Sequence, residues 1–455
     1  MCLKFHSGRE CVYTVHLSKN FLILQGVEFI MSLIMPLTGA IILALAVSLQ
    51  VQAAEWSAEP NISLRSGYND NIRMTLADHD SVWETALTPS VRFGVAKEHQ
   101  GLFGNADVVV RRFTGGEGRE SGDVLDREDA HLSVNAYHNM ERDRFAADLN
   151  ITRDSTLDTE LDETGNVIED RATRLRKSIS PSWTRSLTEK TRMELSYQFS
   201  AVSYSDEIGP LNLIDYDYDV FSAALLRQMT PRIQGTLSAS YSRYQPETNL
   251  ESKTLSLQAG ISRNFSETLS ASFLAGRRET TSDTLVQTGF CIGAPAGATF
   301  PDCGGATFIP TGLATDEIEN TGAVYSASIT KVMETGKLSA SLSRSSSPSG
   351  DGELLDTTRL SLAGEHRFTQ KLTSSLRIEF SDQETIVSRT GITELGSRQF
   401  FRVTPRLAWR WRQEWELAGE YQYAENEEVS GSDTATSNAV YVTLSYRPTK
   451  IYISR

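Results

Sequence analysis

Hydrophobic and polar residues alternate along most of the chain after residue 55. In the segment 191–201, one set of alternate positions carries Met, Leu, Tyr, Phe and Ala, and the other carries Arg, Glu, Ser and Gln. Segments 233–241, 372–380 and 401–412 show the same alternation. Successive side chains of a β-strand point to opposite faces. The pattern therefore predicts strands of about ten to thirteen residues with one apolar and one polar face, and it indicates no helix beyond Trp56.

Connections between these segments alternate between short and long. The eight short turns fall near 97–100, 140–143, 186–190, 229–231, 264–267, 332–336, 369–371 and 412–414. The nine longer polar links fall near 69–81, 114–127, 155–172, 205–215, 245–252, 281–319, 346–356, 383–397 and 425–436. These connections join eighteen strands. An even number of strands, with short turns at one end and long loops at the other, is typical of an outer-membrane β-barrel with periplasmic turns and extracellular loops.

Two regions depart from this pattern. The strands near 103–113 and 130–137 are weakly amphipathic, so a count of sixteen strands is an alternative to eighteen. The run 215–219 alternates Asp and Tyr in the opposite phase to the residues after it. A β-bulge near Val220 would reconcile the two phases, or the Asp-Tyr run stands above the membrane.

The distribution of aromatic and polar residues along the predicted strands fits a membrane barrel. Aromatic residues lie at strand ends, where girdles form at the two membrane interfaces: Trp83, Phe93, Trp183, Tyr204, Tyr244, Trp409, Trp415, Tyr423 and Tyr446. The other face is rich in Ser, Thr, Gln and Arg, which suits a water-filled lumen and would be costly in the dry core of a β-sandwich. We therefore predict an all-β fold, a transmembrane antiparallel β-barrel of about 18 strands.

Composition narrows the class and the compartment. The net charge of −14 argues against a nucleic-acid partner, and the mean hydropathy of −0.30 argues against a bundle of membrane helices. The one long apolar segment, Gly39–Leu49, precedes Val51-Gln52-Ala53, which has small residues at the spacing of a cleavage site. We predict a signal peptide over 1–53 and a single barrel domain over 54–455 in a bacterial outer membrane.

Two points about this N-terminal region stay open. An uncleaved helical anchor over 21–51 is the alternative to cleavage. Because the positive charges lie far upstream of the apolar segment, a translation start downstream of Met1 is also open.

The link 281–319 contains Cys291 and Cys303, and Gly and Pro residues surround both. In an oxidising compartment the pair suggests one disulfide, and two free thiols are the alternative. This link is long enough for us to consider that it folds into the lumen and plugs it.

A row of arginines gives the strongest indication of function. Arg402, Arg406 and Arg410 share one face of a strand, and Arg377 and Glu379 lie on the preceding strand. We predict that these five residues line the pore. Guanidinium groups in a wet lumen would guide an anionic or polyhydroxylated chain through paired hydrogen bonds. Salt bridges that only brace the wall are the alternative.

Catalytic and metal-binding patterns are weak. The histidines beyond residue 53 stand in no arrangement with Ser or Asp that would serve nucleophilic catalysis, so we predict no enzyme activity and no cofactor. The run Asp158–Glu169 resembles a calcium-binding loop, but Glu163 occupies the position that requires Gly. We expect an acidic outer loop that binds divalent ions loosely and bridges lipopolysaccharide phosphates.

Several motifs resemble one known family. They are Gly67-Tyr68-Asn69-Asp70-Asn71, Ser180–Glu189, Ser343–Leu354 and the ending Ser437–Lys450. They resemble the β-barrel porin-2 family of outer-membrane proteins, which are often associated with exopolysaccharide and exosortase (PEP-CTERM) systems. The resemblance spans nearly the whole chain beyond residue 53, but its motifs are structural turns and it carries over no catalytic residue. The chain also continues past Tyr446, whereas many barrels end on an aromatic residue.

The resemblance implies a channel for exopolysaccharide export or for handling of surface polysaccharide. Its partners would be outer-membrane lipid, lipopolysaccharide, a polysaccharide cargo and periplasmic export components. Two alternatives stay open: a general passive porin for small solutes, and a non-conducting structural barrel plugged by residues 281–319.

Overall fold

A computed structural model describes residues 55–76, 79–118, 121–157, 171–208, 213–247, 251–292, 307–387, 397–428 and 434–454. The predicted signal peptide, Cys303 and the run 158–169 lie outside the described residues. The strands are β1 Glu55–Asn69, β2 Val82–Ala96, β3 Gln100–Thr114, β4 Arg127–Asn139, β5 Asp143–Ser155, β6 Arg171–Ser186, β7 Thr191–Ile208, β8 Tyr216–Thr230, β9 Ile233–Pro246, β10 Ser252–Asn264, β11 Leu269–Ile292, β12 Thr307–Met333, β13 Gly336–Pro348, β14 Leu354–Arg367, β15 Leu372–Val387, β16 Ser397–Arg410, β17 Trp415–Glu428, β18 Thr434–Tyr446 and β19 Ile451–Ser454. A single helical turn, α2 Gly122–Leu125, lies between β3 and β4, in a chain for which we expected no helix.

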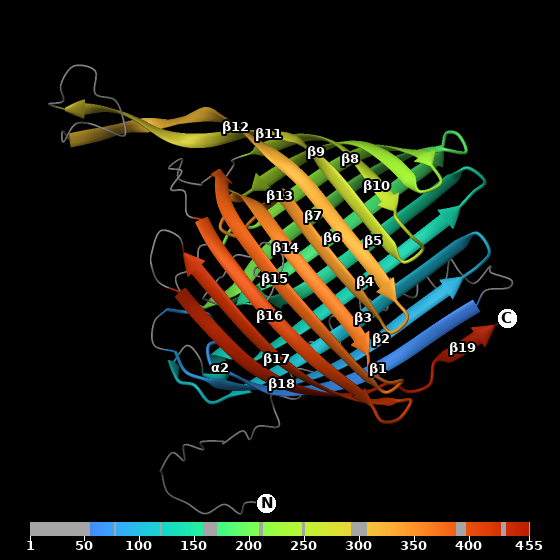
Figure 1. Cartoon of the computed structure of the whole chain (residues 1–455). Coiled ribbons are helices and arrows are strands. Elements are labelled where there is room, and N and C mark those ends of the chain that lie inside the picture. The colour runs from blue at the N-terminus through green and yellow to red at the C-terminus, as the bar shows by residue number, and fades with distance from the viewer. Residues whose placement is uncertain are drawn as a thin grey trace, which may run out of the picture. The chain divides into compact units, whose positions relative to one another are not determined.

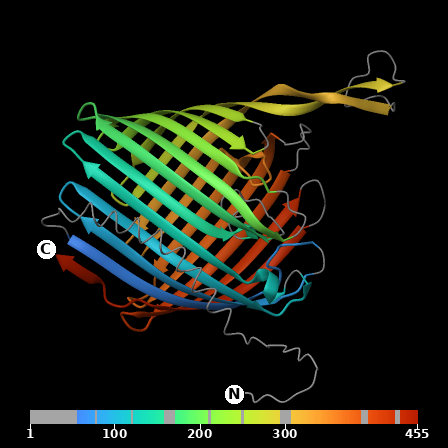
Figure 2. The same cartoon turned by 180° about the vertical axis from the view of Figure 1, so that it is seen from behind.

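The strands form one closed antiparallel barrel. Each strand from β1 to β18 pairs with its neighbours in sequence, and β1 also pairs with β18 to complete the ring (Figures 1 and 2). The short β19 pairs with β1 beside this junction. All eight short turns fall where the alternation placed them, and the weakly amphipathic segments form β3 and β4. The prediction of eighteen barrel strands is confirmed, and sixteen is wrong.

The pairing register fixes which side chains face outward. From strand to strand the register keeps one set of alternate positions together, and this set includes Ile62, Leu87, Leu149 and Leu237, all of them exposed. Exposed Leu and Ile side chains around a closed ring form a lipid-facing belt. The other set carries most of the Arg, Glu, Ser and Thr side chains and faces inward.

Aromatic residues mark the short-turn end of the belt. Trp409, Trp411, Trp415 and Tyr446 form a row of neighbouring rings with centroids 4.7 to 6.1 Å apart. Two residues assigned to the girdle from the sequence do not belong to it. Tyr204 and Tyr244 occupy inward positions, where they form a cluster with Val202, Tyr216 and Tyr218.

The Asp-Tyr run continues its strand without a bulge. The β7–β8 register is unbroken from Thr191↔Arg227 to Val202↔Tyr216, so the bulge near Val220 is wrong. The phase differs because Tyr216 and Tyr218 point inward into this buried cluster, while Asp219 points outward and accepts a hydrogen bond from Tyr197.

The segment 281–319 is largely strand instead of an irregular link. β11 and β12 pair as far as Ile292↔Thr307, and this hairpin runs past the ends of its neighbours, away from the lumen (Figures 1 and 2). Within the described residues it therefore does not form the plug that we considered. Cys291 lies in β11, but its side chain is outside the described part, so the disulfide stays a prediction.

The wall overlaps itself between β12 and β13. These strands pair only from Tyr325↔Arg344 to Met333↔Gly336, although β13 continues to Pro348. Beyond this ladder the inner face of the β11–β12 hairpin touches the outer face of β14 through Arg278 and Asp356, which are 2% and 3% exposed. Arg278 Nε donates to Asp356 Oδ1 at 3.0 Å, and a second hydrogen bond joins Nη2 to Oδ2.

Candidate functional site: the inner wall of the barrel

One side of the inner wall carries the arginines predicted from the sequence. In β15 and β16, Glu379 lies directly opposite Arg402, and both Nε and Nη2 of Arg402 donate to Glu379 Oε2. Arg377 lies opposite Thr404, and its side chain is exposed. The register therefore puts Arg377, Glu379 and Arg402 on one inward face, and their role in lining a pore or binding a ligand stays a prediction.

The remaining arginines of this row converge on another carboxylate. Arg406 and Arg410 lie 3.4 and 3.5 Å from the oxygens of Glu416 on β17, and Arg447 lies 3.9 Å away. Further around the ring, Arg65 lies 3.5 Å from Glu420 and covers the ring of Tyr441. Positive and negative side chains thus alternate along β15 to β18, which is the bracing arrangement considered above. The same groups still present N–H donors to the lumen, because Arg410 and Arg377 are exposed.

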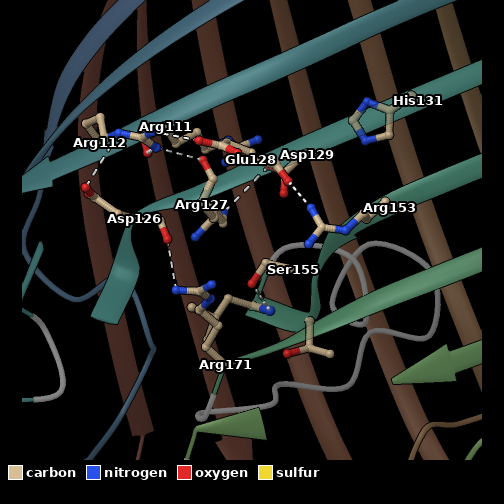
Figure 3. Close-up of polar contacts among 12 residues, drawn as sticks. Arg111, Arg112, Asp126, Arg127, Glu128, Asp129, His131, Arg153, Ser155 and Arg171 are labelled. Carbon is tan, nitrogen blue, oxygen red and sulfur yellow. Dashed lines mark hydrogen bonds and ion pairs between the residues drawn. The ribbon is translucent and has the colours of Figure 1, made fainter. Parts of the chain in front are cut away.

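A second charged cluster lies near the long-link ends of β3 to β6. On the inner face, Arg111 and Arg127 lie 3.3 and 3.7 Å from Asp129 (Figure 3). Arg112 pairs with Glu128 at 2.7 Å on the outer face of the same strands (Figure 3). Arg171 donates to the carbonyl oxygen of Asp126 (Figure 3) and to that of Val124, and these contacts tie β6 to α2.

The same wall holds an inward histidine. His131 on β4 lies directly opposite Asp107 on β3, with Nδ1 and Oδ2 2.7 Å apart. Sequence reasoning missed this cluster and this pair. A signal was present in the weak amphipathicity of 103–113 and 130–137, because inward charges and inward apolar residues mix there.

Connecting segments fold inward at the long-link end. Met74 packs on inward residues of β16, β17 and β18, and Ile72 packs on a second cluster of four residues: Val82, Phe113, Leu125 and Leu157. On the far side, Ile214 N donates to Gly350 O at 2.9 Å, which joins the β7–β8 and β13–β14 links above the tyrosine cluster. Small apolar clusters therefore narrow this end of the lumen, whose face we expected to be rich in Ser, Thr, Gln and Arg.

The motif Gly67-Tyr68-Asn69-Asp70-Asn71 seals the junction between β1 and β18. Asn69 Oδ1 accepts from Ser437 Oγ, and the Asp70 carboxylate accepts from both the backbone and the side chain of Asn438. Asn71 Nδ2 then donates to the carbonyl oxygens of Thr75 and Thr436 at 3.0 Å, which directs the link inward. The motif is structural, as expected.

Two other kinds of feature bear on the chemistry of the described residues, metal sites and membrane-spanning helices. Across the ranges that the structure describes, no group of three or more His, Cys, Asp and Glu side chains is placed to hold a metal ion. No helix in those ranges is long and apolar enough to cross a membrane.

A closed ring of tilted strands, an apolar outer belt and a charged inner wall define the class of this protein. It is a transmembrane β-barrel of the bacterial outer membrane, because a closed barrel leaves no unpaired strand edge in lipid.

No family model matches the chain, and no curated protein matches its sequence. The chain is similar in structure to Pseudomonas aeruginosa OpdQ, with a TM-score of 0.40, 9% identity and coverage of 87% of this chain and 99% of that one. It is similar to Pseudomonas aeruginosa OpdK with vanillate, with a TM-score of 0.41, 11% identity and the same coverages. Acinetobacter baumannii OccAB2 gives a TM-score of 0.40 and 10% identity over 87% of this chain and 98% of that one. The family resemblance drawn from the sequence motifs stays a prediction.

Proposed function

We propose that this barrel is an outer-membrane channel for hydrophilic solutes. The observation that carries the proposal is the inner wall itself. The register places polar side chains inward on strands all around the ring, including the serine-rich faces of β9 and β10 and the paired charges of β15 to β18. At eighteen strands, a barrel is typically wide enough to leave an aqueous lumen.

We propose further that the cargo is a polysaccharide, as the family resemblance implies. The exposed guanidinium groups of Arg377 and Arg410 support a polyhydroxylated or anionic cargo, because a guanidinium presents several N–H donors in a fixed plane. A general porin for small solutes is the competing form of the same proposal.

The test is single-channel conductance of the purified protein in a planar bilayer. We expect stable conductance steps that an added acidic polysaccharide blocks, and a weaker block after Arg402→Ala with Arg406→Ala. Arg112→Ala is the matched control, because Arg112 is also ion-paired but lies on the outward face. Conductance steps that the added polysaccharide does not block would contradict the polysaccharide cargo and favour a general porin for small solutes. A folded barrel without steps would contradict the channel.

A further inference from the structure

Two aromatic rings interrupt the polar inner wall near its short-turn end. Phe103 on β3 and Tyr137 on β4 have centroids 6.2 Å apart and planes inclined by 14°. Their inward direction follows from the register, since Phe103 lies opposite Gly94 in the set that contains Asp107, and Tyr137 lies in the set that contains His131. Phe103 is 41% exposed although it faces away from lipid. A large exposed apolar ring in a polar lumen needs an explanation, because burial would stabilise it.

Glycine residues hold both rings in place. A Cβ atom at Gly101 would lie 2.7 Å from Tyr137 Cε1 and 2.8 Å from Phe103 Cε2. A Cβ atom at Gly94 would lie 2.6 Å from Phe103 Cδ1. The two rings, whose planes are nearly parallel, therefore lean over the bare backbone of β2 and β3 and form an apolar patch, which we call the aromatic platform.

Planar polar groups surround the platform. The guanidinium carbon of Arg144 lies 5.3 Å from the centre of the Tyr137 ring. Asn135, opposite Phe103, donates to Asp148 at 2.7 Å, and Asn105 donates to Asp107 at 3.0 Å. These amides and carboxylates are donors and acceptors in fixed planes, with lone pairs and N–H groups to spare.

A hollow adjoins the platform. It has a volume of about 340 Å³, and Arg144 lines it together with inward polar residues of the neighbouring strands, among them Thr184, Arg192 and Gln234. Arg144 therefore borders both the aromatic platform and the hollow, and it links the apolar rings to a region of hydrogen-bonding groups.

This combination matches the two kinds of surface on a sugar ring. A pyranose presents a face of C–H groups and a rim of hydroxyls. The negative face of an aromatic ring attracts weakly positive C–H groups, and planar amide, carboxylate and guanidinium groups exchange hydrogen bonds with hydroxyls. A purely apolar solute would leave the surrounding polar groups unpaired, and a lipid chain would meet the outer face instead.

We propose that Phe103 and Tyr137, with Arg144, Asn135 and Asp148, form a carbohydrate-binding subsite at the short-turn end of the lumen. The subsite rests on the proposed function, because its ligand reaches it through the lumen. It takes a neutral pyranose ring and needs no charge on the cargo, so it is distinct from the arginine row of β15 to β18.

The test measures binding separately from conductance. The probe is maltohexaose, a neutral linear glucan, titrated by isothermal calorimetry into the full chain in lipid nanodiscs free of glycoside detergent. We expect Phe103→Leu with Tyr137→Leu to weaken binding about tenfold, because leucine keeps apolar volume but loses the planar face. We expect Gly101→Ala to weaken binding as well, because its methyl group displaces both rings.

A matched control exists on the outer face of neighbouring strands. Phe145 and Trp183 have centroids 6.3 Å apart and planes inclined by 15°, but they face lipid. Phe145→Leu with Trp183→Leu should leave maltohexaose affinity unchanged and shows what loss of a ring pair does to folding alone.

The outcomes separate the two proposals. Absence of maltohexaose binding by the wild-type protein, or equal affinity in the platform variant, would overturn the subsite even if the barrel conducts. Binding that depends on the platform in a barrel without conductance steps would support the subsite and contradict the channel. An equal loss of affinity in the control pair would also overturn the subsite, since a general effect on folding would then explain it.

Discussion

The overlap between β12 and β13 gives the sharpest prediction of stability. Asp356→Ala removes the carboxylate that accepts two hydrogen bonds from the buried guanidinium of Arg278. Loss of one partner from a buried ion pair typically costs about 3–5 kcal/mol, because the other charge stays buried without compensation. Arg278 keeps its hydrogen bonds to Thr280 and Asn320, at 3.0 and 3.2 Å, so we expect the lower end, about 3 kcal/mol.

Removing both charges should cost much less. In Arg278→Met with Asp356→Leu no charge stays buried, and the two apolar side chains fill similar volume, so we expect the unfolding free energy to lie within about 1 kcal/mol of the wild type. Asp356 also accepts a hydrogen bond from Arg344 at 3.3 Å, and Arg344 keeps its ion pair with Glu384 in both variants. The double-mutant cycle should therefore show strong coupling between Arg278 and Asp356.

The assay is denaturant unfolding in phospholipid vesicles, followed by tryptophan fluorescence and extrapolated linearly to water. Glu128→Gln serves as the control, since the Arg112–Glu128 pair is exposed and should contribute no more than about 1 kcal/mol. A cost below about 1 kcal/mol for Asp356→Ala would refute the reasoning, as would a double variant no more stable than the single one.

Two other substitutions test separate features. Gly67→Ala should destabilise the barrel by about 1–3 kcal/mol, because the new Cβ would lie 2.3 Å from the carbonyl oxygen of Val440; Gly419→Ala, with nothing within 4 Å, should be near neutral in the same unfolding assay. Equal costs at the two glycines would contradict the steric explanation. Glu251, in the link before β10, loses some solvent by burial, which raises its pKa, but hydrogen bonds from Arg243 and Lys253 outweigh this and hold the pKa below the ordinary 4.5. The ionised Glu251 carboxylate therefore contributes to the stability of the folded protein above pH 4.5, and this contribution is lost as the pH falls through the lowered pKa. The difference in unfolding free energy between the wild type and Glu251→Gln should therefore shrink on acidification. A difference that grows at low pH would contradict this sign.

The alternation of hydrophobic and polar residues predicted the closed barrel, but it did not predict the residue clusters that narrow the long-link end of the lumen. Strand number, turns and the inward face of Arg402 and Glu379 all follow from a period of two, because each strand must present one face to lipid. The direction of Tyr216 was harder to predict from the sequence. An aromatic residue that faces lipid and one that is buried inside the barrel under a connecting link have the same apolar character, so the alternation alone does not distinguish them. The Arg278–Asp356 contact joins residues 78 positions apart, and nothing in either segment indicates its partner.

The aromatic platform shows the same limit from another direction. Phe103 and Tyr137 weakened the alternation of their strands, and that weakness left a barrel of sixteen strands as an alternative to eighteen. The strand register shows that both residues lie on the inward face, where most side chains are polar. The break in the alternation could be interpreted only after the register had shown which face of each strand points inward.

The seal between the first and last strands has a consequence for assembly. Asn69 and Asp70 bond to partners 368 residues away, so those contacts wait for nearly the whole barrel sequence to be synthesised and positioned. Because contacts of great sequence separation form slowly, we expect ring closure to come late in assembly, and a growing sheet exposes two edges until it occurs. The hydrogen bonds of Asn69 and Asp70 to β18 then stabilise the junction between the first and last strands of the closed barrel.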